Sequence, residues 1–218
     1  MIDWARRTWP RASRPLATVL LCGVVATGLQ GCIEMAIGTA VMGTIAATDR
    51  RTLGAQTEDK AIAVKAETRL PQVFGDSAHI NIASFNRRVL LTGEVRDERT
   101  KAEAEREVTA IQAVKSVVNE LVIAAPSSFG DRANDILLTS KVKASFVDTK
   151  DLYANSIKVV TERSVVYLMG RVTQREGNLA TEVARGVNGV RKVVKVFELI
   201  DDEELRQLTN TTGTAAEK

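Results

Sequence analysis

The sequence is poor in the residues that build most catalytic and metal centres. Its 218 residues include two cysteines, Cys22 and Cys32, and a single histidine, His79. Only Cys32 remains beyond the first 31 residues, so a disulfide or a cysteine-based metal site has no second thiol there. A histidine-based triad or zinc site has at most one candidate residue. We expect His79 to be an ordinary surface residue at the start of a strand.

Motifs of nucleotide-binding and hydrolytic enzymes are also missing. Gly170, Gly186 and Gly189 do not form a GxGxxG or Walker loop, and no serine lies in a nucleophile elbow. Acidic residues at 97–107 are interspersed with Lys101 and Arg106, which is typical of a solvated helix face. We therefore expect no enzymatic activity, no cofactor and no bound metal.

The N-terminus has the pattern of an export signal. Residues 1–14 carry four arginines against one acid, and the 13 residues 16–28 are uncharged. A basic segment followed by an apolar one of this length is typical of a signal peptide, whereas a membrane-spanning helix needs about 20 apolar residues. The next residues, Leu29-Gln30-Gly31-Cys32, resemble a lipobox.

A lipobox implies that residues 1–31 are a lipoprotein signal peptide and that Cys32 becomes the lipid attachment site. The next residue is Ile33; in enteric bacteria an aspartate there indicates inner-membrane retention, so Ile33 favours the outer membrane, on its periplasmic face. Residues 32–56 would then form the acylated tether, whose apolar part, 35–47, either lies along the membrane or is a flexible link. The alternative is an uncleaved anchor with an incidental cysteine.

The basic character of the whole chain comes from this export signal. Residues 32–218 contain 26 basic and 26 acidic side chains. A neutral chain lacks the basic footprint of nucleic-acid-binding proteins, so we expect no nucleic-acid partner.

An internal repeat covers most of the chain beyond the tether. Four segments recur in the same order at offsets of 76 or 77 residues, and representative pairs are Asp59 with Asp135, Ile80 with Ile157, Gly93 with Gly170, and Val117 with Val193. The retained glycines, Gly93 and Gly170, are expected to be structural. A repeated unit of this length indicates two small domains of the same fold.

The residue pattern of each unit predicts the order helix, strand, strand, helix, strand. Apolar residues at Leu138, Val142 and Phe146 mark the buried stripe of a first helix. Alternating β-branched residues predict hairpins, with turns at 86–87 and 162–163. The remaining elements are expected at 78–84, 87–95, 99–112 and 116–124 in the first unit and at 155–161, 164–172, 175–187 and 192–200 in the second.

The fold class is therefore α+β, with two tandem αββαβ domains. In each domain two helices pack on one face of a three-stranded mixed sheet. The domains are expected at 57–124 and 131–200, separated by a linker at 125–130. A polar tail, 201–218, is expected to fray or to be flexible.

The repeated unit resembles the BON domain, whose core reads Val-x-Leu-x-Gly-x-Val. That core is found at 89–95 and 166–172, and Gly189-Val190 also fits, although the first unit has Ala113-Val114. A lipobox followed by two such domains resembles the dual BON-domain outer-membrane lipoproteins, and the stretch 48–56 strengthens the match. The resemblance implies a role in outer-membrane integrity and binding of anionic phospholipid, such as phosphatidylglycerol, by the second domain.

Charge partition supports a lipid contact in the second unit. Residues 131–200 carry 12 basic and 8 acidic side chains, whereas residues 58–123 carry 10 and 11. Aliphatic residues that point away from the core stripe and are flanked by lysines suit a membrane interface. We therefore predict a phospholipid-binding surface on the first helix of the second unit, formed by Ile136, Leu137, Lys141, Val142 and Lys143.

Two alternatives stay open at this stage. Ile136 and Leu137 could instead pack against the first unit, with the lysines solvated. The protein could also be a periplasmic adaptor for the outer-membrane assembly machinery, a function for which the polar, acidic surface of the first unit would be available.

Overall fold

The computed structural model describes residues 49–75 and 78–215, with side chains described up to residue 208. These residues belong to one compact unit that begins at Ala47. The expected signal peptide, Cys32 and the expected tether up to residue 48 lie outside the described residues. Within the described part, no helix is both long and apolar enough to cross a membrane.

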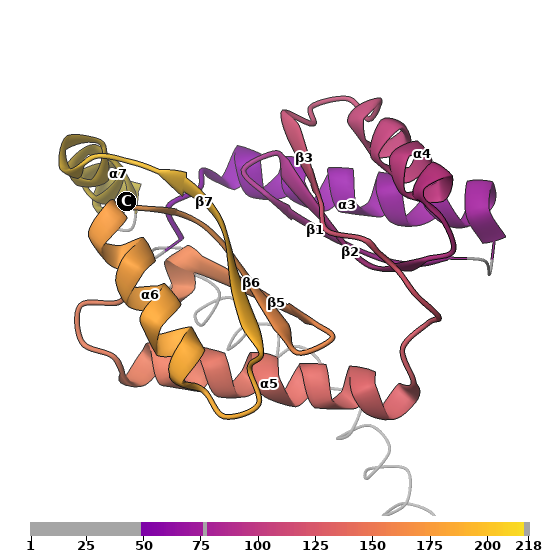
Figure 1. Ribbon diagram of the computed structural model, residues 1–218. Coiled ribbons are helices and arrows are strands. Elements are labelled where there is room, and N and C mark those ends of the chain that lie inside the picture. Colours follow the sequence, from indigo (N-terminus) through magenta and orange to yellow (C-terminus); the bar gives the residue numbers. More distant parts are fainter. Residues whose placement is uncertain (1–48, 76–77, 216–218) are drawn as a thin grey trace, which may run out of the picture. The chain divides into compact units, whose positions relative to one another are not determined.

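The first repeat is a helix-covered sheet (Figure 1). Strand β1 runs antiparallel to β2, and the short strands β3 and β4 both run parallel to β2. The closing strand expected at 116–124 is thus interrupted at residues 120–121, where Leu121 turns into the core. The elements are α3 (Leu53–Phe74), β1 (His79–Phe85), β2 (Arg88–Val95), α4 (Glu98–Thr109), β3 (Ser116–Asn119) and β4 (Val122–Ile123).

The second repeat has the same order and ends in an additional helix. Its sheet has the strand order β5-β6-β7, with β5 antiparallel and β7 parallel to β6. The elements are α5 (Phe129–Asp148), a 3-10 turn (Ala154–Ser156), β5 (Ile157–Glu162), β6 (Val165–Val172), α6 (Gln174–Gly186), β7 (Lys192–Leu199) and α7 (Asp202–Ala215). The predicted α+β class with two αββαβ repeats is confirmed.

Several boundaries differ from the sequence prediction by one to three residues, and three of the differences have a local physical cause. Helix α5 begins at Phe129, inside the expected linker, because Ser128 and Asp131 form a capping box. The second hairpin turns at residues 163–164 rather than 162–163, since Glu162 still pairs with Val165. The tail expected to fray forms helix α7, whose acidic first turn favours helix initiation through the helix dipole.

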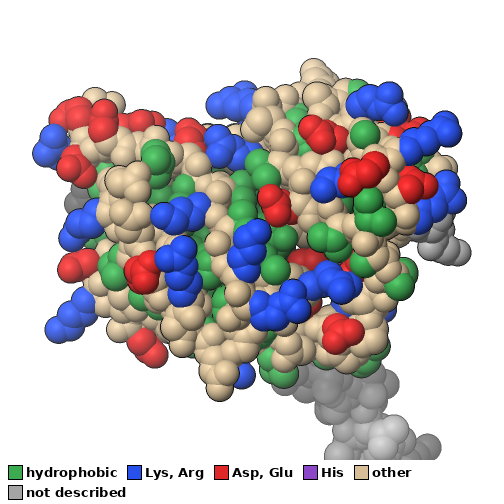
Figure 2. Space-filling model, viewed as in Figure 1, with side chains coloured by type: hydrophobic (Ala, Val, Ile, Leu, Met, Phe, Trp, Pro, Cys, Tyr) green, Lys and Arg blue, Asp and Glu red, His purple; other side chains and the backbone are tan. Residues whose placement is uncertain are grey.

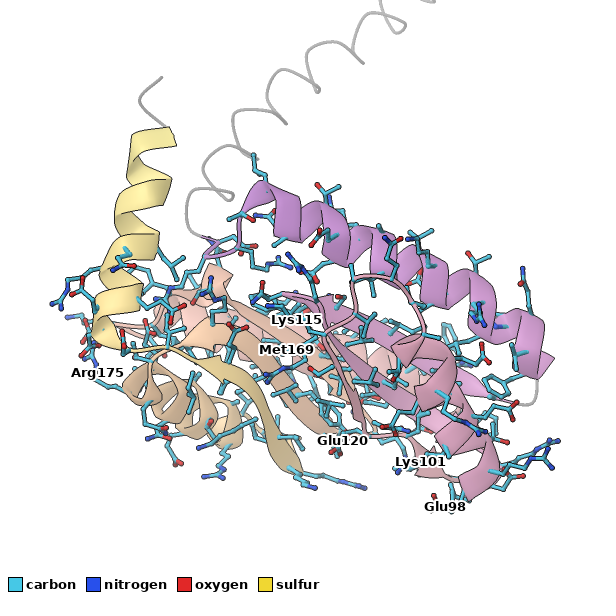
Figure 3. The ribbon with its side chains drawn as sticks, turned by 90° about the horizontal axis from the view of Figure 1, so that it is seen from above. Glu98, Lys101, Lys115, Glu120, Met169 and Arg175 are labelled. Carbon is cyan, nitrogen blue, oxygen red and sulfur yellow. The ribbon has the colours of Figure 1, made fainter. Side chains whose placement is uncertain are left out.

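Each central strand is buried on both faces, which explains its nearly continuous apolar sequence. In β2, Val89 and Leu91 pack under the helices of the first repeat, while Leu90 points to the opposite face of the sheet. There Leu90 joins an apolar cluster with Tyr167 and Met169 of β6. Met169 lies between the two sheets (Figure 3). The two repeats therefore pack against each other through the sheet faces that the helices leave uncovered.

One aspartate in each repeat holds its hairpin turn. Asp59 of α3 accepts hydrogen bonds from the backbone N–H groups of Asn86 (2.7 Å) and Arg87 (2.8 Å). Asp135 of α5 accepts equivalent bonds from the turn residues 163 and 164, both at 2.8 Å. All four turn residues have positive φ angles of 50–64°, as tight hairpin turns of this kind require. This role accounts for the repetition of Asp59 as Asp135.

Close backbone contacts explain the two predicted structural glycines. A Cβ on Gly93, which has a φ of +114°, would lie 2.1 Å from the carbonyl oxygen of His79. A Cβ on Gly170 would lie 2.6 Å from the carbonyl oxygen of Ser156. Both contacts are with backbone atoms of the neighbouring strand or of the turn before it, so neither can be relieved by a side-chain rotation.

The difference between Ala113 and Gly189 gives a stability prediction. Ala113 has a φ of +74°, and the equivalent Gly189 has a φ of +101°. The left-handed region costs a residue with a Cβ atom roughly 1–2 kcal/mol. Glycine avoids this cost but loses more conformational entropy on folding, so the net gain is smaller. We expect Ala113→Gly to raise the free energy of unfolding by about 0.5–1 kcal/mol, as measured by urea denaturation. The reciprocal change, Gly189→Ala, should destabilise, and a lower stability of Ala113→Gly would contradict the prediction.

Candidate functional site

Helix α5 has one face in the core and the opposite face in solvent. Leu138, Val142 and Phe146 are at most 1% exposed and pack against the sheet and α6. The helix runs along the outside of the second repeat (Figure 1). Its 20 residues span about 30 Å at 1.5 Å per residue. The outer face is thus a long surface on one regular element.

This outer face carries large apolar side chains that nothing in the described chain covers. Phe129 is 83% exposed, Ile136 68%, Leu137 60% and Val147 73%. At about 100° per residue, Phe129, Ile136 and Val147 fall within roughly 20° of one line along the helix. Leu137 lies about 80–100° to one side of this line. Large apolar side chains left exposed on one helix face indicate an interaction site.

Basic side chains flank the apolar stripe. Arg132 and Lys143 lie on one side of it and Lys141 on the other, and all three are exposed. We call the exposed set the α5 surface; it consists of Phe129, Arg132, Ile136, Leu137, Lys141, Lys143 and Val147. Basic side chains also gather over β7 in the view of Figure 2. The excess positive charge of the second repeat is thus displayed on its exterior.

The structure brings together four of the five residues predicted for this surface. Ile136, Leu137, Lys141 and Lys143 are all exposed, so the alternative in which Ile136 and Leu137 pack against the first repeat is wrong for this structure. Val142 is 0% exposed and belongs to the core of the second repeat. It therefore has no part in the surface, as its place in the i, i+4, i+8 stripe already implied.

Two members of the surface were missed in the sequence. The sequence prediction places Phe129 in the linker and leaves Val147 outside the surface. The signal that could have found them is the Ser128-x-x-Asp131 pattern, which starts the helix early enough to include Phe129. The spacings of 7 and 11 residues from Phe129 to Ile136 and from Ile136 to Val147 then place all three on one helix face.

The segment before the first repeat is fixed to both repeats by two arginines. Arg50 forms a two-pronged ion pair with Glu176 of α6 (2.8 and 2.6 Å) and donates to the carbonyl of Arg171 (2.9 Å). The neighbouring Arg51 pairs with Asp49 and with Asp59 of α3. Residues 50 and 51, just before α3, therefore contact both domains.

Hydrogen bonds set the charge state of the two carboxylates that these arginines contact, Glu176 and Asp59. Burial raises the pKa of Glu176, but the hydrogen bond from Arg50, the backbone N–H of Thr173 and the positive charge of Arg50 outweigh it and lower the pKa overall. Burial likewise raises the pKa of Asp59, and hydrogen bonds from Ser84, Arg87, Arg51 and Asn86 lower it further than burial raises it. Both carboxylates are thus held in their charged form.

Comparison with known proteins agrees with this architecture. The family model of the BON domain matches residues 58–125 and 134–201. The chain is 36% identical over 176 residues to the Outer membrane lipoprotein DolP of Haemophilus influenzae, covering 79% of this chain and 91% of that protein. It is 27% identical over 154 residues to the 21 kDa hemolysin of Actinobacillus pleuropneumoniae, covering 70% and 79%.

A solved structure of CdsD, a structural protein of the type III secretion system of Chlamydia trachomatis, is also similar over 66% of this chain and 96% of its own. Its identity of 15% and TM-score of 0.27 are too low to carry an argument.

Two BON domains joined by a short linker, with one helix face open to solvent, define a tandem BON-domain protein. This chain belongs to the family of dual BON-domain outer-membrane lipoproteins. It is a lipid-anchored protein of the outer membrane on the periplasmic side, and the family is non-enzymatic.

Proposed function

We propose that this lipoprotein binds anionic phospholipid through the α5 surface and thereby helps to maintain the integrity of the outer membrane. Cys32, exposed after removal of residues 1–31, would carry the lipid, and residues 32–56 would connect it to the first domain. The observation that carries the proposal is the apolar stripe of α5 with cations on both sides.

The physical basis is the sum of two weak attractions and an anchor. Apolar side chains gain roughly 25 cal/mol for each Å² that they remove from water, and each basic residue near an anionic membrane contributes about 1 kcal/mol. Either contribution alone gives weak binding. A lipid anchor on the same chain raises the effective concentration of the surface at the bilayer, so weak contacts are sufficient.

Charge reversal on α5 tests the electrostatic part. We expect Lys141→Glu with Lys143→Glu to weaken binding of residues 47–218 to phosphatidylglycerol vesicles at least tenfold, since about 1 kcal/mol is lost with each lysine. Co-sedimentation at low and high salt measures this, and wild-type binding should fall as salt screens the charges.

The control is the same change on the first repeat, Lys101→Glu with Lys115→Glu. These two lysines lie at α4 and before β3 (Figure 3), so binding should stay within about twofold of wild type by the same argument from charge at the contact. Equal binding to phosphatidylcholine and phosphatidylglycerol vesicles, or equal losses in the two double variants, would reject the proposal.

A single tryptophan can report insertion of the apolar stripe. Both tryptophans of the chain, Trp4 and Trp9, lie in the proposed signal peptide, so residues 47–218 contain none. We expect Leu137→Trp fluorescence to shift to the blue on phosphatidylglycerol vesicles as the indole leaves water. Val64→Trp on α3 is the matched control, since Val64 is also 60% exposed on a helix. The same blue shift at position 64, or none at 137, would count against a contact through α5.

A protein partner is the alternative occupant of the same surface. An exposed apolar stripe also suits protein–protein contact, as expected for an adaptor of the outer-membrane assembly machinery. A photo-crosslinking amino acid at position 137 in intact cells separates the two proposals. Adducts of lipid mass would support phospholipid binding, whereas a single protein adduct with no lipid product would support the adaptor.

A further inference from the structure

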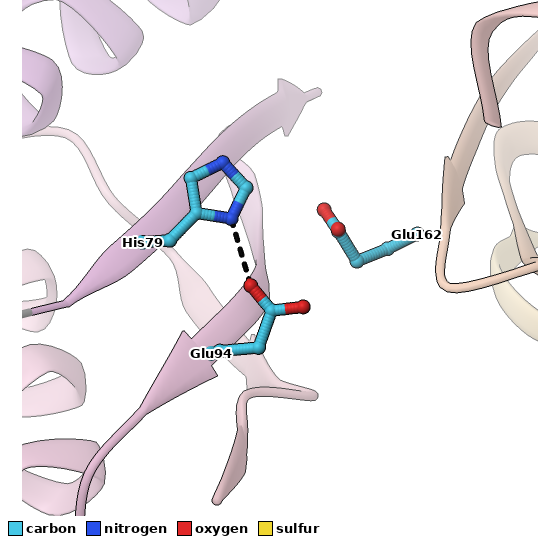
Figure 4. Close-up of side chains that lie close together, drawn as sticks. All are labelled: His79, Glu94 and Glu162. Carbon is cyan, nitrogen blue, oxygen red and sulfur yellow. Dashed lines mark hydrogen bonds and ion pairs between the residues drawn. The ribbon is translucent and has the colours of Figure 1, made fainter. Parts of the chain in front are cut away.

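A buried polar cluster lies where the two repeats meet (Figure 4). His79 begins β1, and Glu94 is its direct cross-strand partner in β2. Glu162 comes from the last position of β5, in the second repeat. The side chains of Glu94 and Glu162 are buried, and the side chain of His79 is 22% exposed.

The donor atoms of these three residues converge. The Nδ1 atom of His79 lies 2.9 Å from Oε2 of Glu94. One nitrogen and one oxygen from each carboxylate all lie within 4.8 Å of one another. The other oxygen of Glu94, Oε1, accepts hydrogen bonds from Arg163 and Ser127. Glu94 is thus held so that Oε2 faces His79.

Glu162 is a buried carboxyl group that has no lysine or arginine partner among the described residues. It is 5% exposed, and its Oε2 accepts a hydrogen bond of 2.6 Å from the side-chain amide of Asn81. Among the described residues, no lysine or arginine forms an ion pair with it. The only guanidinium in the cluster, that of Arg163, pairs with Glu94. Burying a charged carboxylate with neutral donors alone is costly, so this position favours either a proton or a bound cation.

We propose that His79, Glu94 and Glu162 bind a divalent transition-metal ion of the zinc class. One imidazole nitrogen and two carboxylate oxygens, with water as the fourth ligand, are a donor set that zinc accepts in a tetrahedral site. A bound ion would take the place of the hydrogen between Nδ1 of His79 and Oε2 of Glu94, because a metal-ligating imidazole nitrogen carries no hydrogen. Calcium prefers six to eight oxygen ligands and magnesium an octahedral shell, so three donors including a nitrogen disfavour both.

The consequence of such a site is a bridge between the domains. Two ligands come from the first repeat and one from the second, so the bound ion would link the repeats beside the start of α5. The sequence contains a single histidine, from which no bound metal is expected. The fold supplies the two carboxylates from different repeats.

The test uses the full chain, without a histidine tag, in non-ionic detergent. Calorimetric titration with Zn²⁺ is expected to show one site that Glu162→Gln and His79→Gln each weaken at least ~10-fold, while Mg²⁺ gives no binding at that site. Zn²⁺ should also raise the Tm of wild type by several degrees but not that of Glu162→Gln. Since His79 is the only histidine, its imidazole NMR signals report directly on ligation.

The matched control is Glu198→Gln. Glu198 also accepts a hydrogen bond of 2.6 Å from an asparagine of the other repeat, Asn86, but lies outside the cluster. It should bind Zn²⁺ like wild type. Circular dichroism without metal checks that every variant is folded. The proposal is overturned if wild type and Glu162→Gln bind Zn²⁺ equally, or if the His79 signals do not respond to Zn²⁺.

Discussion

Replacing Arg50 with alanine is expected to lower the free energy of unfolding by about 3–5 kcal/mol. Its guanidinium and the carboxylate of Glu176 are 6% and 5% exposed, and the pair is two-pronged. Removing Arg50 leaves Glu176 as a buried charge without its counter-ion and also frees the carbonyl of Arg171. The loss therefore includes the desolvation cost of the abandoned carboxylate as well as the lost attraction.

Urea denaturation at neutral pH measures this loss, with Arg185→Ala as the control. Arg185 forms an ion pair with Glu182 one helical turn away, but the two side chains are 55% and 70% exposed. Exposed pairs contribute about 0–1 kcal/mol, so the control should be nearly neutral. A similar loss in both variants would show that burial of the Arg50 pair does not have the effect described.

Replacing Asp59 with alanine is expected to lower the free energy of unfolding by a comparable ~3–5 kcal/mol. Each hydrogen bond to a charged group contributes about 1.5–3 kcal/mol, and the contributions of neighbouring bonds do not add fully. Asp59 accepts from two backbone N–H groups of the hairpin turn, from the hydroxyl of Ser84 and from Arg51. Asp135→Ala removes only the two turn bonds. Chemical denaturation should therefore rank Asp59→Ala as the more damaging change, and the reverse order would contradict this account.

The same carboxylate should make stability depend on pH. Burial raises the pKa of Asp59, but its hydrogen bonds outweigh burial and hold the pKa in the folded protein below the ordinary value of 3.8. A lowered carboxylate pKa means that the stabilisation is present above the unfolded-state pKa and is lost as the pH falls through the folded-state value. Asp59→Asn should thus destabilise at pH 7 and converge on wild type in strong acid. An unchanged difference across this range, measured by denaturation at each pH, would argue against a charged Asp59.

Much of the fold could be read from the sequence because its patterns are local. The spacing of Leu138, Val142 and Phe146 follows one helix face, and the Val-x-Leu-x-Gly-x-Val core follows one strand. The repeat doubled each of these signals. The boundaries follow less directly from the sequence, since the capping box at Ser128 and the turn at residues 163–164 each depend on a pair of hydrogen bonds rather than on periodicity.

The candidate surface was predictable for the same reason. Ile136, Leu137, Lys141 and Lys143 lie on one helix, where angular position follows directly from residue number. The prediction of Val142 for this surface is wrong, because Val142 belongs to the buried stripe with Leu138 and Phe146. Phe129 is absent from the predicted surface because α5 begins two residues before the predicted start of the second domain.

The lipobox pattern, the two-repeat α+β fold and the outward face of α5 follow from local sequence patterns. The pairing of Arg50 with Glu176, the bonds from Asp59 to the turn at residues 86–87, and the meeting of Glu162 with His79 and Glu94 appear only in the folded chain. Those contacts join residues far apart in the chain, and their partners are selected by how the two sheets pack against each other, which no local spacing encodes.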